Sequence, residues 1–323
     1  MVRTDMNLRL LQCVLLASAL AAPLHAQPTD SITGSPASAT LADAETTLFA
    51  TPTVRDRVGR IVAPVMVNDQ GPFRFLVDTG ANRSVLSEHM PSRLGLTLNG
   101  QDKVSLSGVT GDAIVPLAKV ARVRAGALVL ENLSMPIISA TMGGLDGVLG
   151  VEGLADKRLV VDFANDRISI EKSSNKRAPR EFVSLPGRFR HGLLLVVDVT
   201  VEGVATKAVI DTGAERSLGN ERLRWAVQRM TNGDHVAGVA NVEGVTADIQ
   251  KGDMAFLPLI RFEGVEIQGV PIAYGDFNVF RLWDLQRVPA LLVGMDILGT
   301  VDTMAIDYRR RELQLKPTES KTN

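Results

Sequence analysis

Two stretches of the chain carry the same four residues after the same kind of apolar run. The first is FRFLVDTGANRSVLS, residues 73–87, and the second is KAVIDTGAERSLGN, residues 207–220. In each stretch three apolar residues lead a strand into the core, and Asp78 or Asp211 stands where that strand ends. The Gly two residues after each Asp permits a tight turn and close backbone approach. The pattern predicts a carboxylate held rigidly at the end of a buried strand. A single copy is more often an ordinary Asx-type turn after a strand.

Further landmarks repeat in the same order along the chain. Three stretches of the first half have a similar stretch in the second half: SGVTGDA matches EGVTADI, DGVLGVEGL matches ALLVGMDIL, and VVDFANDRISI matches AIDYRRRELQL. Each half also opens with a hairpin pattern, in which strand-like runs flank the turns NDQG and VEG. The order and spacing of these landmarks predict an internal duplication in which both halves are mainly β.

The predicted fold class is therefore all-β in the main, with two similar lobes. The polar, Pro-containing stretch EKSSNKRAPREFVSLPG divides the two halves and reads as a linker. We expect six regions: a signal peptide at 1–26, a disordered tether or pro-segment at 27–57, an N-terminal lobe at 58–170, a linker at 171–187, a C-terminal lobe at 188–315 and a tail at 316–323.

The N-terminus is typical of an export signal. Arg3 and Arg9 precede the apolar run LLQCVLLASALAAPL, and Ala26 offers a small residue before a cleavage bond. The run is shorter than the roughly 20 residues of a membrane span, so a membrane anchor is expected only if the signal stays uncleaved. Cys13 is the one cysteine of the chain and lies inside this run. A mature chain without cysteine excludes disulfides and thiol catalysis, and indicates an exported protein of the bacterial periplasm.

Composition and motifs exclude several other classes. The net charge of −1 argues against nucleic acid or an anionic membrane as a partner held by bulk electrostatics. The four histidines, His25, His89, His191 and His235, have no metal-ligand spacing, and no dinucleotide, phosphate-loop or G-x-S-x-G motif occurs. We therefore expect no metal and no cofactor.

Two matching loops suggest a chemistry that needs two carboxyl groups. Packing the halves about a pseudo-two-fold axis would bring equivalent loops together. Two carboxyl groups so near to each other cannot both ionise easily, so they share one proton. Such a pair supplies a general base and a general acid at one site and can hold a water between them. Hydrolysis of a peptide bond requires those two operations.

These residues resemble the retropepsin-like and pepsin-like aspartic proteases, over roughly Val58 to Leu315. The resemblance rests on the two Asp-Thr-Gly-Ala loops and on the elements VLG, residues 148–150, and LVG, residues 292–294. It implies two β-barrel lobes related by a pseudo-two-fold axis, with Asp78 and Asp211 as the catalytic dyad. It also implies four supporting residues that lock and shape the loops: Thr79, Gly80, Thr212 and Gly213. The expected substrate is a protein or an extended peptide, and the expected state is a monomer with the pseudo-dimer built in.

The same family closes a β-hairpin flap over its substrate. The candidate flap tips are two Gly-Val-Thr triplets, made of Gly108, Val109, Thr110, Gly244, Val245 and Thr246. An ordinary hairpin turn is the alternative interpretation. Two flap candidates resemble the retroviral dimers, whereas the single pepsin flap carries a Tyr that neither triplet contains.

Other residues near the motifs have structural interpretations. Arg83 and Arg216 are expected to brace each loop by a salt bridge, and Glu152 and Asp296 to be structural acids. Ser84 and Ser217 can support the site by hydrogen bonds but lack a base that would make them nucleophiles. The stretch 277–283, FNVFRLW, is expected in core or inter-lobe packing, or as the wall of a substrate pocket.

Three functions follow from the motifs. The first is an aspartic endopeptidase, the second a non-catalytic peptide-binding module of the same fold. The third is a glycosidase with a carboxylate pair, which does not need two identical Asp-Thr-Gly turns.

Overall fold

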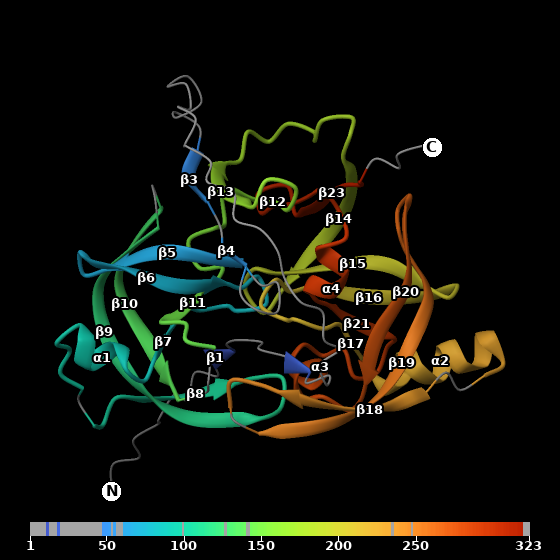
Figure 1. Ribbon diagram of the computed structural model, residues 1–323, viewed down its shortest axis with the longest axis horizontal. Helices are drawn as coiled ribbons and strands as arrows, with labels where there is room; N and C mark the ends of the chain where they lie inside the picture. Colours follow the sequence, from blue (N-terminus) through green and yellow to red (C-terminus); the bar gives the residue numbers. More distant parts are fainter. Residues whose placement is uncertain are drawn as a thin grey trace, which may run out of the picture.

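A computed structural model gives the architecture of the chain (Figure 1). The described residues are 11–12, 18–19, 47–52, 54–55, 61–98, 100–125, 128–139, 143–233, 236–246 and 248–318. Most of the expected signal peptide and tether therefore lies outside the described residues. Within the described part, no helix is long and apolar enough to cross a bilayer.

The first lobe is a β-barrel closed by pairing between two strands of one sheet. Its sheet runs in the order β1-β8-β9-β10-β7-β11-β6-β5-β4, and the pairing of β9 with β5 closes it. The elements are β1 (Leu11–Gln12), β4 (Val54–Arg55), β5 (Ile61–Val67), β6 (Gln70–Val77), β7 (Val85–Ser87), α1 (Met90–Arg93), β8 (Lys103–Ser107), β9 (Asp112–Ala125), β10 (Leu128–Ile138) and β11 (Gly147–Leu149).

The second lobe repeats these pairings in the same order. The strands that correspond to β5–β11 are β15–β21, and β19 with β15 makes the closing contact. The elements are β2 (Ser18–Ala19), β15 (Leu194–Val201), β16 (Val204–Ile210), β17 (Leu218–Gly219), α2 (Glu221–Thr231), β18 (Val236–Glu243), β19 (Ile249–Phe262), β20 (Val265–Tyr274), α3 (Asn278–Leu282), β21 (Ala290–Val293) and α4 (Met295–Leu298). The prediction of a mainly β chain with two barrel lobes is confirmed.

A further set of strands joins the lobes. Figure 1 shows it on the side of the molecule opposite β8 and β18. Its strands are β3 (Thr47–Pro52), β12 (Lys157–Asp162), β13 (Arg167–Lys172), β14 (Val183–Arg190), β22 (Thr303–Asp307) and β23 (Glu312–Lys316). Since β3 lies in the stretch expected as a tether, part of that stretch pairs with the folded body. Strands also occupy both ends of the expected linker, which leaves 173–182 as the connecting segment.

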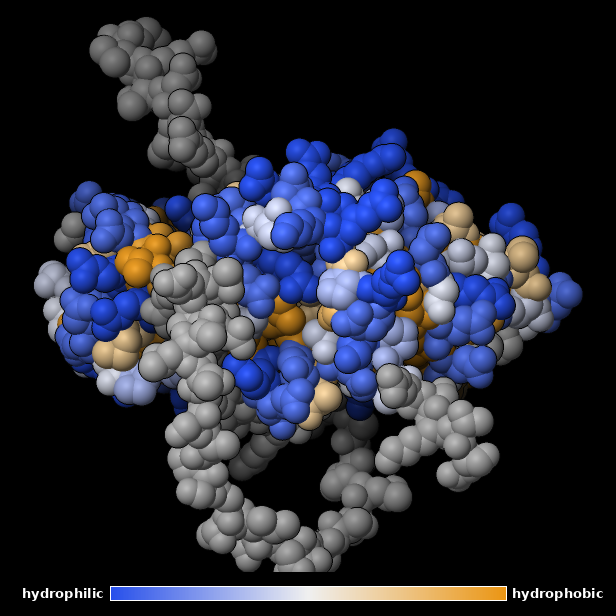
Figure 2. Space-filling model, turned by 90° about the horizontal axis from the view of Figure 1, so that it is seen from above, coloured by the Kyte–Doolittle hydropathy of each residue, from blue (hydrophilic) through white to orange (hydrophobic). Residues whose placement is uncertain are grey.

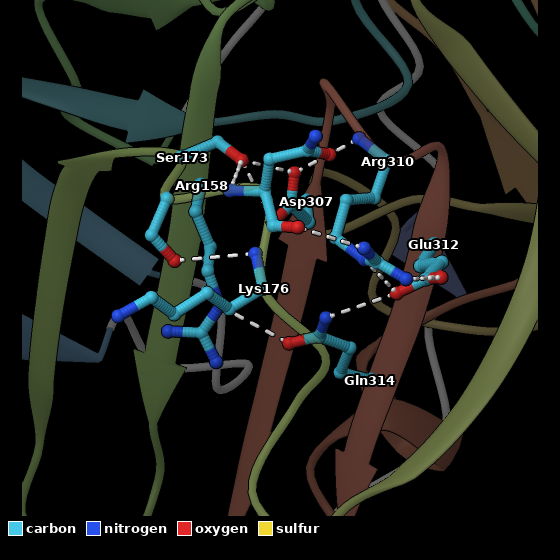
Figure 3. A network of polar contacts seen from close by, with 9 residues as sticks. Arg158, Ser173, Lys176, Asp307, Arg310, Glu312 and Gln314 are labelled. Carbon is cyan, nitrogen blue, oxygen red and sulfur yellow. Dashed lines mark hydrogen bonds and ion pairs between the residues drawn. The ribbon is translucent and has the colours of Figure 1, made fainter.

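The strands β12 and β22 lie side by side, and successive side chains of β22 face two different environments. On β22, Met304 and Ile306 face the hydrophobic core, while Asp307 faces a polar network on the other side. The network is drawn in Figure 3: Ser173 donates to Asp307 at 2.8 Å, and Arg310 pairs with Glu312 at 2.7 Å. The network connects the linker to the C-terminal strands. The pairing of β12 with β22 places the ends of both lobes in one sheet.

Buried apolar side chains from the strands of both lobes form the core. The alternation of β5, whose Ile61, Ala63, Val65 and Val67 are buried, is typical of a strand with one face against the core. The face shown in Figure 2 is mostly hydrophilic, with a few separate hydrophobic patches.

Candidate active site

The two aspartates lie where buried strands end, at equivalent places in the lobes. Asp78 follows β6 and Asp211 follows β16, and both are buried, with 1 % and 0 % exposure. Each loop is anchored by a parallel neighbour: the N–H of Asp78 donates to the Leu149 carbonyl (3.1 Å), and that of Asp211 to the Val293 carbonyl (3.0 Å). The VLG and LVG elements therefore support the loops from behind.

Reciprocal hydrogen bonds join the two loops across the pseudo-two-fold axis. The backbone N–H of Thr79 donates to Oγ1 of Thr212 (3.1 Å), and the N–H of Thr212 donates to Oγ1 of Thr79 (3.0 Å). Each hydroxyl then donates into the opposite lobe, from Thr79 to the Ile210 carbonyl (2.9 Å) and from Thr212 to the Val77 carbonyl (2.8 Å). Both threonines are buried, so all four bonds are shielded from water.

The glycine of each loop lies against the carboxyl group of the other loop. A Cβ on Gly80 would lie 2.6 Å from Cγ of Asp211, and a Cβ on Gly213 would lie 2.3 Å from Cγ of Asp78. Each glycine N–H also donates to Oδ1 of the aspartate two residues earlier, at 2.8 Å in both loops. The structure thus brings the two carboxyl groups together, with backbone donors on both.

The electrostatics of the pair follow from burial and proximity. Burial raises the pKa of Asp211 well above its ordinary value, and the charge of Asp78 and a hydrogen bond with it raise that pKa further. Two backbone N–H groups, from Gly213 and Ala214, oppose the shift. The arrangement favours one proton shared between the two carboxyl groups.

A serine and an acid support each loop. Oε1 of Glu152 accepts from the Ser84 N–H at 2.6 Å, and Asp296 accepts from both the N–H (3.0 Å) and the hydroxyl (2.7 Å) of Ser217. The serine oxygens in turn accept from the N–H of Gly150 and Gly294, both at 3.0 Å. We call the Ser84–Glu152 and Ser217–Asp296 pairs the loop staples.

The arginines after the loops, Arg83 and Arg216, are expected to brace each loop by a salt bridge. Nε of Arg216 lies 3.9 Å from Oε1 of the adjacent Glu215. The charges of Arg83 and Arg216 also act on Glu152 and Asp296, whose pKa values they lower against the larger effect of burial. Each arginine therefore acts electrostatically on the acid of its own loop staple, and the bracing salt bridge remains a prediction.

The two Gly-Val-Thr triplets meet each other. Oγ1 of Thr110 lies 3.1 Å from Oγ1 of Thr246, and a Cβ on Gly244 would lie 2.6 Å from Oγ1 of Thr110. Val109 packs into a cluster of the second lobe that includes Ala214, and Val245 packs into a cluster of the first lobe that includes Ala81. Each triplet thus inserts its valine beside the Asp-Thr-Gly-Ala loop of the opposite lobe. A flap role remains a prediction.

Asn278 holds the first triplet, and no motif in the sequence points to it. The side-chain amide of Asn278 donates to the Gly108 carbonyl at 3.1 Å, and the N–H of Val279 donates to the Val109 carbonyl at 3.4 Å. Phe277, Phe280 and Trp283 of the same stretch are buried in the cluster that receives Val109. The expected inter-lobe packing of 277–283 is therefore observed. The apolar residues of this stretch predict the inter-lobe packing, but they do not single out Asn278.

Across the part of the chain that the structure describes, no group of three or more His, Cys, Asp or Glu side chains is placed to bind a metal ion. The site consists of carboxyl groups, hydroxyls and backbone donors. Such a donor set suits proton transfer and the binding of water or a carbonyl oxygen.

Comparison with known proteins agrees with the geometry of the first lobe. Residues 63–152 match the family model described as Aspartyl protease. No curated protein matches the chain. The matched segment contains the Asp78 loop, the first Gly-Val-Thr triplet and the VLG element. Over residues 63–152, the chain is therefore similar to the aspartyl protease family.

Proposed function

We propose that the chain is an aspartic endopeptidase that hydrolyses peptide bonds with a water activated between Asp78 and Asp211. The observation that carries the proposal is the close approach of the two buried carboxyl groups, each against the glycine of the other loop. Four buried inter-lobe hydrogen bonds fix that approach. Geometry held in advance in this way is what general acid–base catalysis requires.

The chemistry follows from one proton on two carboxyl groups. The ionised carboxylate takes a proton from the water as the water oxygen attacks the peptide carbonyl carbon. The protonated partner gives its proton to the carbonyl oxygen, and a tetrahedral diol forms. When the diol collapses, the C–N bond breaks. The carboxyl group that took the proton from the water gives it to the nitrogen, which leaves as an amine, while the other carboxylate takes a proton from a diol hydroxyl. The second product is a carboxylic acid, and the pair again holds one proton. No acyl-enzyme forms, so no nucleophilic side chain is needed.

An extended polypeptide is the proposed substrate. Two strands of the chain itself, β1 and β2, pair with β8 and β18, which lead toward the two Gly-Val-Thr triplets. These edges thus accept an extended backbone, the mode by which peptides bind by strand addition. We propose that the triplets are flap tips that close over such a peptide and open to admit it.

Two further features belong to the proposal. The repeated pairing order of the lobes supports an origin by internal duplication. The N-terminal sequence supports export to a bacterial periplasm, with the mature chain acting there as a monomer without metal or cofactor.

The proposal is tested by incubating the purified chain from residue 27 with a reduced, unfolded protein over a range of pH, and identifying the products by mass spectrometry. We expect internal peptide-bond cleavage that pepstatin inhibits and that EDTA and serine- or cysteine-directed reagents do not. The variant Asp69→Asn, at an exposed acid in a β-turn, is a matched control and should cleave as the wild type does.

The alternative function, a non-catalytic peptide-binding module of the same fold, gives a different result. It would bind the unfolded protein without cleaving it at any pH. That outcome would overturn the proposal.

A further inference from the structure

Two short strands from the N-terminal end of the chain pair with the strands that lead into the Gly-Val-Thr triplets. The strand β1 pairs in parallel with β8, with Gln12 opposite Ser107 (Figure 1). The strand β2 pairs in antiparallel with β18, with Ser18 opposite Glu243. Ser107 and Glu243 each immediately precede the glycine of a triplet. The N-terminal segment is therefore bound at equivalent positions of the two lobes.

The opposite senses of these two pairings are what one continuous chain requires. The strands β8 and β18 converge from their own lobes, because the triplets at their ends meet, with Oγ1 of Thr110 3.1 Å from Oγ1 of Thr246. A chain that follows β8 toward this meeting point and continues beyond it must run against the direction of β18. It then pairs in parallel with the first strand and in antiparallel with the second, as β1 and β2 do. The N-terminal segment thus passes from one lobe to the other in a single direction, as an extended peptide would.

Both paired edges lie beside the aspartate loops. Leu106, which is opposite β1, is buried in the first-lobe cluster that contains Ala81. Val242, which is opposite β2, is buried in the second-lobe cluster that contains Ala214. Ala81 and Ala214 are the last residues of the two Asp-Thr-Gly-Ala loops. The N-terminal segment is therefore anchored on both sides of the carboxyl pair.

The length and the sequence of the segment indicate what the edges accept. The paired positions 12 and 18 are six residues apart, an extended reach of about 20 Å, so a ligand that pairs with both edges must be longer than that. Residues 10–20, LLQCVLLASAL, contain no charged side chain. Apolar clusters lie behind both edges, and a charged side chain buried against them would be costly.

We propose that the N-terminal segment carrying β1 and β2 is an internal ligand of the peptide site, and that this site takes apolar, uncharged, extended segments of the kind found in export signals. Resting on the proposed function, this names the substrate class of the carboxyl pair. An attached ligand acts at an effective concentration in the millimolar range. The chain that keeps its N-terminal segment therefore excludes other peptides, and removal of the segment after Ala26 frees the site.

The first test removes the segment from the full chain. The chain is made by cell-free synthesis as Asp78→Asn, so that turnover does not interfere, with the recognition site of a specific protease inserted after Ala26. Hydrogen exchange of β8 and β18 is measured before cutting and after cutting and dilution. We expect exchange to rise by about tenfold or more in both strands, while β12 and β22 exchange as before. Unchanged exchange in β8 and β18, or a rise in one of them only, would overturn the proposal.

Proline substitutions test the same contacts in the uncut chain. Proline lacks the backbone N–H and fits poorly into a paired strand. The double variant Gln12→Pro, Ser18→Pro should therefore raise exchange in β8 and β18 as cutting does. The control Ser31→Pro makes the same change outside β1 and β2 and should leave both strands unchanged. Equal exchange in the double variant and the control would contradict binding by strand pairing.

Added peptides test the ligand class. A peptide of residues 10–20, kept reduced and extended by two lysines for solubility, is added to the cut chain. We expect it to protect β8 and β18 again, and its counterpart with Leu15→Asp and Leu16→Lys to require at least about tenfold more for the same protection. In the uncut chain the first peptide should change neither strand. Equal potency of the two peptides would overturn the assigned ligand class.

These readouts do not require turnover. If the wild type cleaves no protein but β8 and β18 respond as expected, the internal ligand stands and the protease function fails. If cleavage occurs and neither strand responds to removal of the segment, the function stands and the internal ligand fails.

Discussion

Thr79 and Thr212 each accept a hydrogen bond from the backbone N–H of the other, at 3.1 and 3.0 Å, from opposite lobes of one chain. The two hydroxyls are completely or nearly completely buried. This exchange holds two loops that are far apart in sequence at one fixed separation. The position of both carboxyl groups depends on it.

Replacing Thr212 by Val should therefore destabilise the chain by about 2–4 kcal/mol, because the Thr79 N–H and the Val77 carbonyl lose their partner in a buried place. Thr212→Ser keeps the hydroxyl and should recover most of that loss. Chemical denaturation monitored by circular dichroism measures both. Equal stability of the Val and Ser variants would contradict the role of the hydroxyl.

The glycine at position 213 leaves no room for a side chain. A Cβ there would lie 2.3 Å from Cγ of Asp78, so Gly213→Ala must displace the carboxyl group or the loop. We expect a loss of activity of at least about 100-fold, since a displacement of this size disrupts catalytic alignment. The control is Gly238→Ala, where a Cβ would have no neighbour within 4 Å. Activity of Gly213→Ala close to that of the control would show that the spacing of the loops is not critical.

The loop staples should give the stability of the chain a specific pH dependence. Burial raises the pKa of Glu152 and Asp296 above their ordinary values. The folded state therefore holds their protons at pH values where the unfolded state has released them. By linkage, the free energy of unfolding must fall as pH rises from the ordinary carboxyl range through the raised values.

The double variant Glu152→Gln, Asp296→Asn should flatten that fall, while Asp211, whose pKa is raised as well, keeps part of it. Urea unfolding at intervals between pH 4 and pH 8 measures the slope. A double variant with the full wild-type slope would mean that the staple acids do not titrate in this range.

Asn278 should hold the first Gly-Val-Thr triplet closed. Its amide donates to the Gly108 carbonyl, and Val109 beside it is completely buried in the second lobe. We expect Asn278→Ala to increase hydrogen exchange in the segment 104–112 and to change KM more than kcat, because opening precedes the chemical step. Asn241→Ala, at an exposed position of β18, is the control. Unchanged exchange in Asn278→Ala would argue that packing of Val109 alone closes the triplet.

The sequence predicted the parts of the site that repeat. The paired Asp-Thr-Gly-Ala loops and the VLG and LVG elements are local patterns, and their repetition implied the symmetry that brings them together. It did not predict that each triplet inserts its valine into the opposite lobe, because a valine in a turn looks the same whichever core receives it. The role of Asn278 likewise depends on a contact between segments far apart in the chain.

The inequality of Phe163 and Tyr308 shows a different limit. Both residues are visible in the repeated VVDFANDRISI and AIDYRRRELQL stretches. Only the fold shows that they are equivalent, since the N–H of Phe163 donates to the Asp302 carbonyl and the N–H of Tyr308 donates to the Lys157 carbonyl. It also shows that the Tyr308 hydroxyl is buried. A repeat read along the sequence emphasises what the halves share, whereas the fold also shows where they differ.

The most direct test of the central claim is the rate of peptide-bond cleavage by Asp78→Asn and by Asp211→Asn, each compared with the wild type on the same unfolded protein. Each variant keeps the shape of the site and removes one proton-transferring carboxyl group. We predict that each one alone lowers kcat by on the order of a thousandfold or more while the circular dichroism spectrum is retained. Cleavage within about tenfold of the wild-type rate by either folded variant would contradict catalysis by a paired carboxyl site.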